Sequence, residues 1–168
     1  MRSTLIFLTL LTTTSAVWAA EEPSGCDKFK WNIDHARTAL TAPDRVKLNS
    51  GSEVASLPVT GLTLALVTSA DAKLLTPPER APKDGTFAGF TKFAALPKAG
   101  NYTISLSSGA WIDLVQDGHS LKPTAFSGAR DCDGIRKTVK FDLAATPFVI
   151  QISGSREKAI SITVQPSQ

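Results

Sequence analysis

Short runs in which hydrophobic and polar residues alternate dominate the chain from about residue 86 onward and restrict its fold more than any other feature. Within residues 101–107, Tyr102, Ile104 and Leu106 fall on one side of the run and polar residues on the other. A strand places successive side chains on opposite faces, whereas a helix needs hydrophobic residues three and four apart. The pattern therefore predicts an all-β protein whose strands each bury one face.

Comparable runs recur along the chain and are separated by turn residues. The other predicted strands are 28–33, 59–68, 86–96, 110–116, 119–126, 135–144, 147–153 and 159–164. Asp117-Gly118 is the strongest hairpin signal, because a type I′ turn needs positive φ at both central residues. Pro123 marks an edge or a bulge in the strand that returns from this turn.

These strands predict two stacked antiparallel sheets, because strands with one hydrophobic face must bury that face against another layer. The short connections between the last three strands predict that they are antiparallel neighbours. The expected fold is a β-sandwich of jelly-roll or immunoglobulin-like type with one short helical turn at Asp34–Thr41, stopped by Pro43. A partly closed barrel is the alternative.

The first residues have the pattern of a secretory signal peptide. Arg2 precedes the apolar run 5–11, and small residues lead to a predicted cut after Ala19. Residues 20–168 then form a single predicted domain, and no segment in them is long and apolar enough to span a membrane. The location is predicted to be periplasmic or secreted. A lipoprotein alternative at Cys26 fits less well, because charged residues separate this cysteine from the apolar run.

The predicted mature chain is only slightly basic. Removing Arg2 from the 18 basic side chains leaves 17 against 15 acidic ones, a net charge of +2. Nucleic-acid-binding proteins usually show a clustered basic stripe, so no nucleic-acid partner is predicted.

Two cysteines, Cys26 and Cys132, are the only ones in the sequence. An even number in an exported protein predicts a disulfide bond, with two free buried thiols as the alternative. The acidic neighbours Asp27, Asp131 and Asp133 disfavour a thiolate, so the predicted bond is structural instead of redox-active.

The segment around Trp111 is the first candidate binding site. If Ile112 and Leu114 face the core, Trp111 and Asp113 lie on the other face, next to the hairpin residue His119. A tryptophan beside a carboxylate is typical of sites that stack a sugar ring or an aromatic ligand. The alternative is that Trp111 covers the end of the sandwich and His119 is an ordinary solvated hairpin residue.

A basic stretch near Cys132 is the second candidate. In a strand, Arg136, Thr138 and Lys140 share the face opposite Val139. This face is either a solvated, edge-protecting surface or a docking site for an anionic partner or polysaccharide.

No catalytic residues, metal ligands or cofactors are predicted. The sequence lacks a Gly-x-Ser-x-Gly elbow and a phosphate-binding glycine loop. Its two histidines, His35 and His119, share no ligand spacing, and a metal-dependent enzyme would need them to converge with a carboxylate.

Four stretches resemble small exported proteins of proteobacteria: residues 26–31, 99–104, 111–113 and 132–137, which read CDKFKW, AGNYTI, WID and CDGIRK. Such proteins sometimes carry the label homogentisate dioxygenase. That enzyme family is cytoplasmic, longer and built on a histidine-rich iron site, whereas this chain has two histidines, so the label implies no activity here. More loosely, the strand at 100–106 is similar to strands of sandwich domains appended to secreted peptidases and glycan-binding proteins.

Together these observations predict a non-enzymatic exported β-sandwich that binds a small molecule, a glycan or a protein of the cell envelope. A small metal-dependent enzyme using His35 and His119 is one alternative, and a structural subunit of an envelope complex is another.

Overall fold

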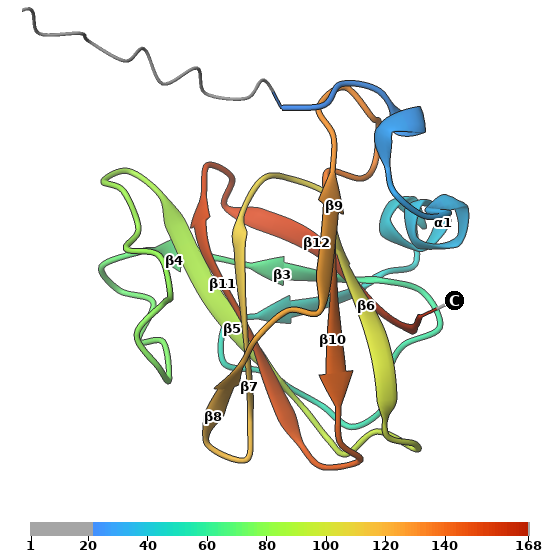
Figure 1. Cartoon of the computed structure of the whole chain (residues 1–168). Coiled ribbons are helices and arrows are strands. Elements are labelled where there is room, and N and C mark those ends of the chain that lie inside the picture. The colour runs from blue at the N-terminus through green and yellow to red at the C-terminus, as the bar shows by residue number, and fades with distance from the viewer. Residues whose placement is uncertain (1–21, 168) are drawn as a thin grey trace, which may run out of the picture.

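A computed structural model of the chain describes residues 22–167, and the predicted signal peptide at 1–19 lies outside this range. Two β-sheets lie face to face, and one α-helix, the only one among these residues, lies beside one of them (Figure 1). The predicted all-β sandwich is thereby confirmed, and the sheets do not close into a barrel. No helix among residues 22–167 has the length and hydrophobicity to cross a lipid bilayer.

Each sheet contains six strands within the described residues. The first sheet has the order β1 (Val46–Asn49), β3 (Leu62–Ala65), β12 (Ala159–Pro166), β6 (Gly100–Leu106), β10 (Lys137–Leu143), β9 (Ala125–Gly128). The second has the order β2 (Glu53–Val54), β5 (Phe87–Phe93), β11 (Phe148–Ser155), β7 (Trp111–Gln116), β8 (His119–Leu121), with β4 (Val67–Thr68) also paired to β5.

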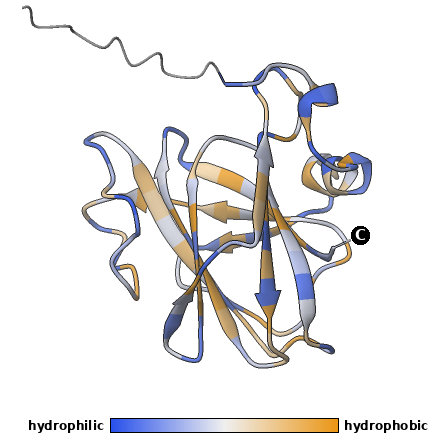
Figure 2. Cartoon of the chain, viewed as in Figure 1, coloured by the Kyte–Doolittle hydropathy of each residue, from blue (hydrophilic) through white to orange (hydrophobic). Residues whose placement is uncertain are grey.

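One hydrophobic core fills the space between the sheets, and the hydrophobic residues lie mostly along the strands (Figure 2). The residues that the alternation assigns to the core are buried there: Tyr102, Ile104, Leu106, Ile112, Leu114, Val139, Phe141, Leu143, Phe148, Ile150, Ile152, Ile160, Ile162 and Val164. The rings of Phe93 and Phe148 stack with their centroids 4.8 Å apart. The period-two pattern therefore identifies the buried face of these strands correctly.

The strand pairing differs from the prediction in two respects. The strands β10, β11 and β12 are not neighbours, because β11 belongs to the second sheet and the other two to the first. Their short connections cross from one sheet to the other instead of turning back within a sheet. In addition, β1 runs parallel to β3 and β2 runs parallel to β5, so both sheets are mixed.

The predicted hairpin is present, but its return strand is divided. Asp117 and Gly118 both have positive φ, at 51° and 78°, as a type I′ turn requires. After this turn β8 pairs with β7, and the chain then passes through Pro123 and continues as β9 beside β10 in the other sheet. The proline thus marks a change of sheet.

The N-terminal segment is the clearest error of the sequence analysis. The predicted strand at 28–33 is absent: a 3₁₀ turn, η1 (Cys26–Lys28), is followed by irregular backbone. The apolar side chains of this segment pack into a small second cluster with Cys132 and Ile135. The backbone N–H of Lys30 donates to Ser127 Oγ instead of entering a strand ladder. The following helix α1 has the predicted bounds, Asp34–Thr41.

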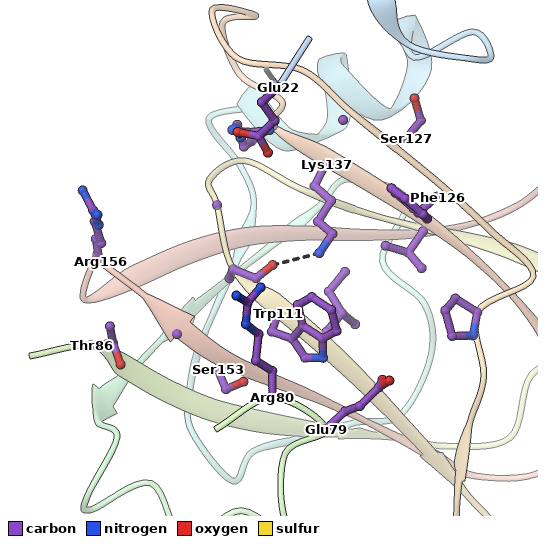
Figure 3. Close-up of a pocket in the computed structure, with 18 of the residues that line it drawn as sticks. Glu22, Glu79, Arg80, Thr86, Trp111, Phe126, Ser127, Lys137, Ser153 and Arg156 are labelled. Atoms are coloured by element: carbon purple, nitrogen blue, oxygen red, sulfur yellow. Dashed lines mark hydrogen bonds and ion pairs between the residues drawn. The ribbon is translucent and has the colours of Figure 1, made fainter. Parts of the chain in front are cut away.

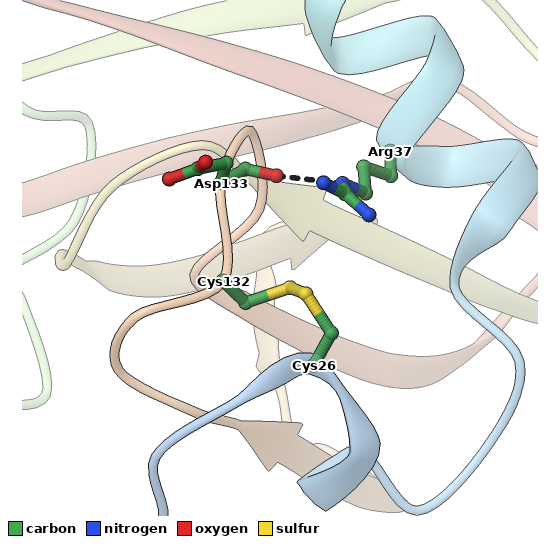
Figure 4. Close-up of a disulfide and its surroundings, with 4 residues drawn as sticks. All are labelled: Cys26, Arg37, Cys132 and Asp133. Carbon is green, nitrogen blue, oxygen red and sulfur yellow. Dashed lines mark hydrogen bonds between the residues drawn. A yellow bond between two sulfur atoms is a disulfide. The ribbon is translucent and has the colours of Figure 1, made fainter.

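A disulfide joins Cys26 to Cys132 and so confirms the predicted pairing (Figure 4). Hydrogen bonds hold the same loop: the N–H of Gly25 donates to Arg130 O at 2.8 Å, and Arg37 Nε, on the following helix, donates to Asp133 O at 2.7 Å. The bond fixes the N-terminal segment against the loop before β10. It is compatible with an oxidising compartment such as the periplasm or the exterior.

Candidate functional site

A groove of about 700 Å³ is lined by residues of β9 and β10 from the first sheet and of β7 and β11 from the second. Its walls also include the N-terminal segment at 22–30 and the loop at 79–86 (Figure 3). Trp111, at the start of β7, lines this groove. A volume of this size is typical of a small-molecule site.

The charges that line the groove are mostly positive, so we call it the basic groove. It has seven basic side chains: Lys28, Lys30, Arg80, Lys83, Arg136, Lys137 and Arg156. Only two acidic side chains, Glu22 and Glu79, lie among them. Its apolar surface includes Phe126, which is 63% exposed and has Lys30 Nζ 5.1 Å from its ring centroid.

Two cations lie over the Trp111 ring. Lys137 Nζ is 4.7 Å from the ring centroid and donates a hydrogen bond to Ala110 O at 3.2 Å. The guanidinium carbon of Arg80 is 5.8 Å from the same centroid. The electron-rich face of an indole attracts cations by about 0.5–2 kcal/mol, depending on desolvation. Trp111 therefore holds positive charge in the groove.

The ammonium group of Lys137 is held in an unfavourable environment. Burial lowers its pKa, and the neighbouring Arg136 guanidinium lowers it further. Arg136 itself pairs with the carboxylate of Glu22, whose pKa this hydrogen bond lowers. One cation of the basic groove, Arg136, thus already forms an ion pair with a carboxylate of the chain itself, that of Glu22.

Asp113 lies two residues beyond Trp111 on the same face of β7 and is only 7% exposed. Its Oδ1 accepts a long hydrogen bond of 3.4 Å from the N–H of Glu79. Burial raises the pKa of this carboxyl, and the Glu79 N–H offsets part of that rise. The Trp111 side chain, acting as a hydrogen-bond donor to this carboxyl, offsets a further part of the rise.

The loop that carries Glu79 and Arg80 is fastened to the sheet by Gln151. This side chain is fully buried on β11; its Oε1 accepts the N–H groups of Leu75 and Thr76, at 2.7 and 3.0 Å. Its Nε2 donates to the carbonyl and the hydroxyl oxygen of Thr76. The irregular, proline-rich loop therefore has a defined position over the outer face of the second sheet.

The buried carboxyl of Asp113 gives a first prediction. Because the folded state binds its proton more tightly than the unfolded state, the unfolding free energy falls as pH rises from the ordinary aspartate pKa through the raised one. Asp113→Asn keeps the Oδ1 acceptor and removes the charge, so we expect about 1 kcal/mol of added stability at pH 7, or about 2–4 °C in melting temperature.

The gain should disappear at a pH below both pKa values, where the native carboxyl is protonated as well. Thermal unfolding of the native protein and of Asp113→Asn, at acidic and at neutral pH, measures the difference in melting temperature between the two proteins. Asp44→Asn, at an exposed position, is the control. An equal gain at both pH values would contradict the electrostatic origin.

A second cavity of about 410 Å³ lies on the outer face of the first sheet, beside α1. Lys140 and Trp31 line it, and Lys140 Nζ lies 4.6 Å from the Trp31 ring centroid. We call this cavity the polar hollow, because most of the side chains of β6, β10 and the C-terminal residues that line it are polar and uncharged.

The two histidines are not brought together. His35 lies on α1 and lines the polar hollow, whereas His119 is exposed on β8, at the opposite end of the molecule (Figure 1). Within residues 22–167, no group of three or more His, Cys, Asp or Glu side chains is arranged to hold a metal ion.

The predicted site residues are thus divided between different places. Trp111 and Arg136 line the basic groove, and Asp113 is buried near it. Lys140 lines the polar hollow, and His119 lines neither cavity. The strand β10 begins at Lys137, so Arg136 precedes it. The alternation that was expected to place Arg136 and Lys140 on one face of a strand therefore does not reach Arg136.

Two residues of the basic groove, Lys137 and Arg80, are not among the predicted site residues, although Lys137 belongs to the basic stretch near Cys132. The inward direction of Lys137 could have been predicted, because it lies two residues before the buried Val139 and so shares the same face of the strand. Arg80 belongs to an irregular loop, where no periodicity indicates which way a side chain points.

No protein-family model matches the sequence, and a search of curated proteins finds no match. The resemblance to exported proteobacterial proteins therefore stays a prediction.

Proposed function

We propose that the protein acts outside the cytoplasm as a non-enzymatic binding module for an acidic saccharide chain, held in the basic groove. The observation that carries the proposal is the excess of seven basic over two acidic side chains around one groove. Cations spread along a groove with low-dielectric walls attract a ligand that carries several negative charges.

The arrangement around Trp111 supports an anionic ligand over a neutral one. Lys137 and Arg80 lie over the indole, so an uncharged sugar would have to displace them before it could stack. Burial, and after it the repulsion from Arg136, lowers the pKa of Lys137, and an incoming carboxylate would offset both by stabilising the charged ammonium group. The exposed Phe126 ring offers an apolar contact for the faces of sugar rings at the same groove.

Titration with oligogalacturonate, a chain of sugar carboxylates, tests the proposal. We expect binding by isothermal titration calorimetry that weakens as salt is added, and no binding of a malto-oligosaccharide of equal length. Lys137→Gln and Arg80→Gln should each weaken oligogalacturonate binding about tenfold, the loss expected for one charge-assisted contact.

Lys122→Gln is the matched control, because Lys122 is exposed between β8 and β9 and does not line the groove. Equal affinity for the acidic and the neutral oligosaccharide would contradict the proposal. So would an equal effect of the Lys122 and Lys137 substitutions, since that would indicate attraction to the overall charge of the surface.

A further inference from the structure

Glu22 places a carboxylate of the chain itself among the cations of the basic groove (Figure 3). It forms an ion pair with Arg136, in which the guanidinium Nη2 donates to the carboxylate Oε2. This hydrogen bond is the largest cause of the lowered pKa of the Glu22 carboxyl, and burial opposes it. The charges of Arg136, Arg130 and Lys137 lower the pKa further. Three basic side chains therefore stabilise one carboxylate at this place.

The N-terminal segment does not need this ion pair to keep its position. The N–H of Arg130 donates to Pro23 O at 2.7 Å, and the N–H of Gly25 donates to Arg130 O at 2.8 Å. The disulfide from Cys26 holds the same segment covalently. Exposed ion pairs add little to folding stability, and the Glu22 side chain is 58% exposed. Anchoring of the segment therefore does not explain why a carboxylate lies on this guanidinium.

Arg136 has little room for a second carboxylate. Its side chain is 24% exposed, and Glu22 already accepts from Nη2. The other terminal nitrogen, Nη1, lies beside Gly128 of β9, 3.5 Å from the position that a Cβ on this glycine would take. The carboxylate of a uronic acid carries the same charge and the same two acceptor oxygens as that of Glu22. The two groups therefore compete for one guanidinium.

The position of Glu22 in the chain makes it an effective competitor that is still displaceable. Its neighbour Pro23 is fixed by the hydrogen bond from Arg130, so the carboxylate stays close to Arg136. A group held by a short tether acts at an effective concentration in the millimolar range. Because the side chain is mostly exposed, it is free to turn into solvent when another carboxylate takes its place.

We propose that the Arg136 guanidinium is the subsite for one carboxylate of the acidic saccharide, and that Glu22 occupies this subsite until the ligand displaces it. This inference rests on the proposed function of the basic groove. Glu22 therefore weakens binding although it lines the groove. The N-terminal segment as a whole still favours binding, because it also brings Lys28 and Lys30 to the groove.

Isothermal titration calorimetry with oligogalacturonate, on the disulfide-bonded chain, tests the subsite. Glu22→Gln should bind about two- to fivefold more tightly than the native protein, the range that a partly exposed ion pair represents. Its melting temperature should stay within about 2 °C of the native value. Glu53→Gln is the matched control, because Glu53 is also an exposed glutamate paired with a basic side chain, Lys92, and does not line the groove. It makes the same change in net charge and should not change the affinity.

A second pair of variants tests whether the gain arises at Arg136. In an Arg136→Gln background, Glu22→Gln should lose most of its gain, because the subsite for which the two carboxylates compete is gone. The inference is overturned, and the proposed function stands, if the native protein binds oligogalacturonate and Glu22→Gln binds it no more tightly. It is also overturned if Glu53→Gln gives the same gain or if the gain persists without Arg136. Absence of binding in both the native protein and Glu22→Gln would overturn the proposed function and the inference together.

Discussion

Replacing both cysteines, Cys26→Ser with Cys132→Ser, should lower the melting temperature by about 10–20 °C while leaving the strand content at low temperature intact. The bond closes a loop with a sequence separation of 106 residues. The chain-entropy model gives about 4–5 kcal/mol for a loop of this length, and a domain of this size loses about 2–4 °C per kcal/mol. Differential scanning calorimetry and far-ultraviolet circular dichroism measure the two parts of the prediction.

The same variant should also lose affinity for oligogalacturonate, because the disulfide holds the segment that contributes Glu22, Lys28 and Lys30 to the basic groove. Ser24→Ala is the matched control. It removes the hydrogen bond of 2.6 Å from Ser24 Oγ to Asp131 Oδ2, which joins the same two segments, and keeps the covalent link. We expect a change of about 1 kcal/mol or less from it. An unchanged melting temperature in the double variant would show that the bond contributes no stability.

Gln151→Leu should release the proline-rich loop from the second sheet at a cost of about 3 kcal/mol. Leucine is similar in size but leaves the N–H groups of Leu75 and Thr76 and the carbonyl of Thr76 without their partner. Several buried backbone groups that lose a hydrogen bond together account for this magnitude. Urea unfolding measures the loss of stability.

Limited digestion with trypsin and mass spectrometry detects the release of the loop, since Arg80 and Lys83 lie in it. Gln116→Leu is the control: Gln116 fastens the turn at Ala144 and Thr146 by three hydrogen bonds of the same kind. Both variants should be destabilised, but only Gln151→Leu should be cut rapidly after Arg80 under conditions where the fold persists. Equal cutting of the two would indicate that general loss of stability, and not loop release, exposes the site.

The faces of the strands could be predicted because alternation is a local property. Trp111 and Asp113 are opposite Ile112 and Leu114 in the sequence pattern and in the structure alike. The pairing of strands is not local. A connection such as 145–147 is as compatible with a crossing between two sheets as with a hairpin, and only the packing of the whole core decides between them.

The candidate site was predictable only in part for a related reason. Trp111 and Arg136 were identified from their own segments, but the basic groove arises where six separate parts of the chain meet, including the irregular loop with Arg80. The N-terminal segment shows the opposite failure. Phe29, Trp31 and Ile33 alternate as a strand would, yet they pack around the disulfide, so the pattern identified buried residues and assigned the wrong backbone conformation.

The positions of β11 and β12 have a consequence for when the molecule is able to fold. Each is the third strand in the order of its sheet, although both belong to the last stretch of the chain. Neither sheet can form its full set of strand pairs until the ribosome has released the C-terminal residues. A nascent chain therefore has two incomplete sheets. A polypeptide that must remain unfolded to pass through a secretion channel benefits from this delay. The signal peptide predicted from the sequence would have the whole period of synthesis in which to direct the unfolded chain to such a channel.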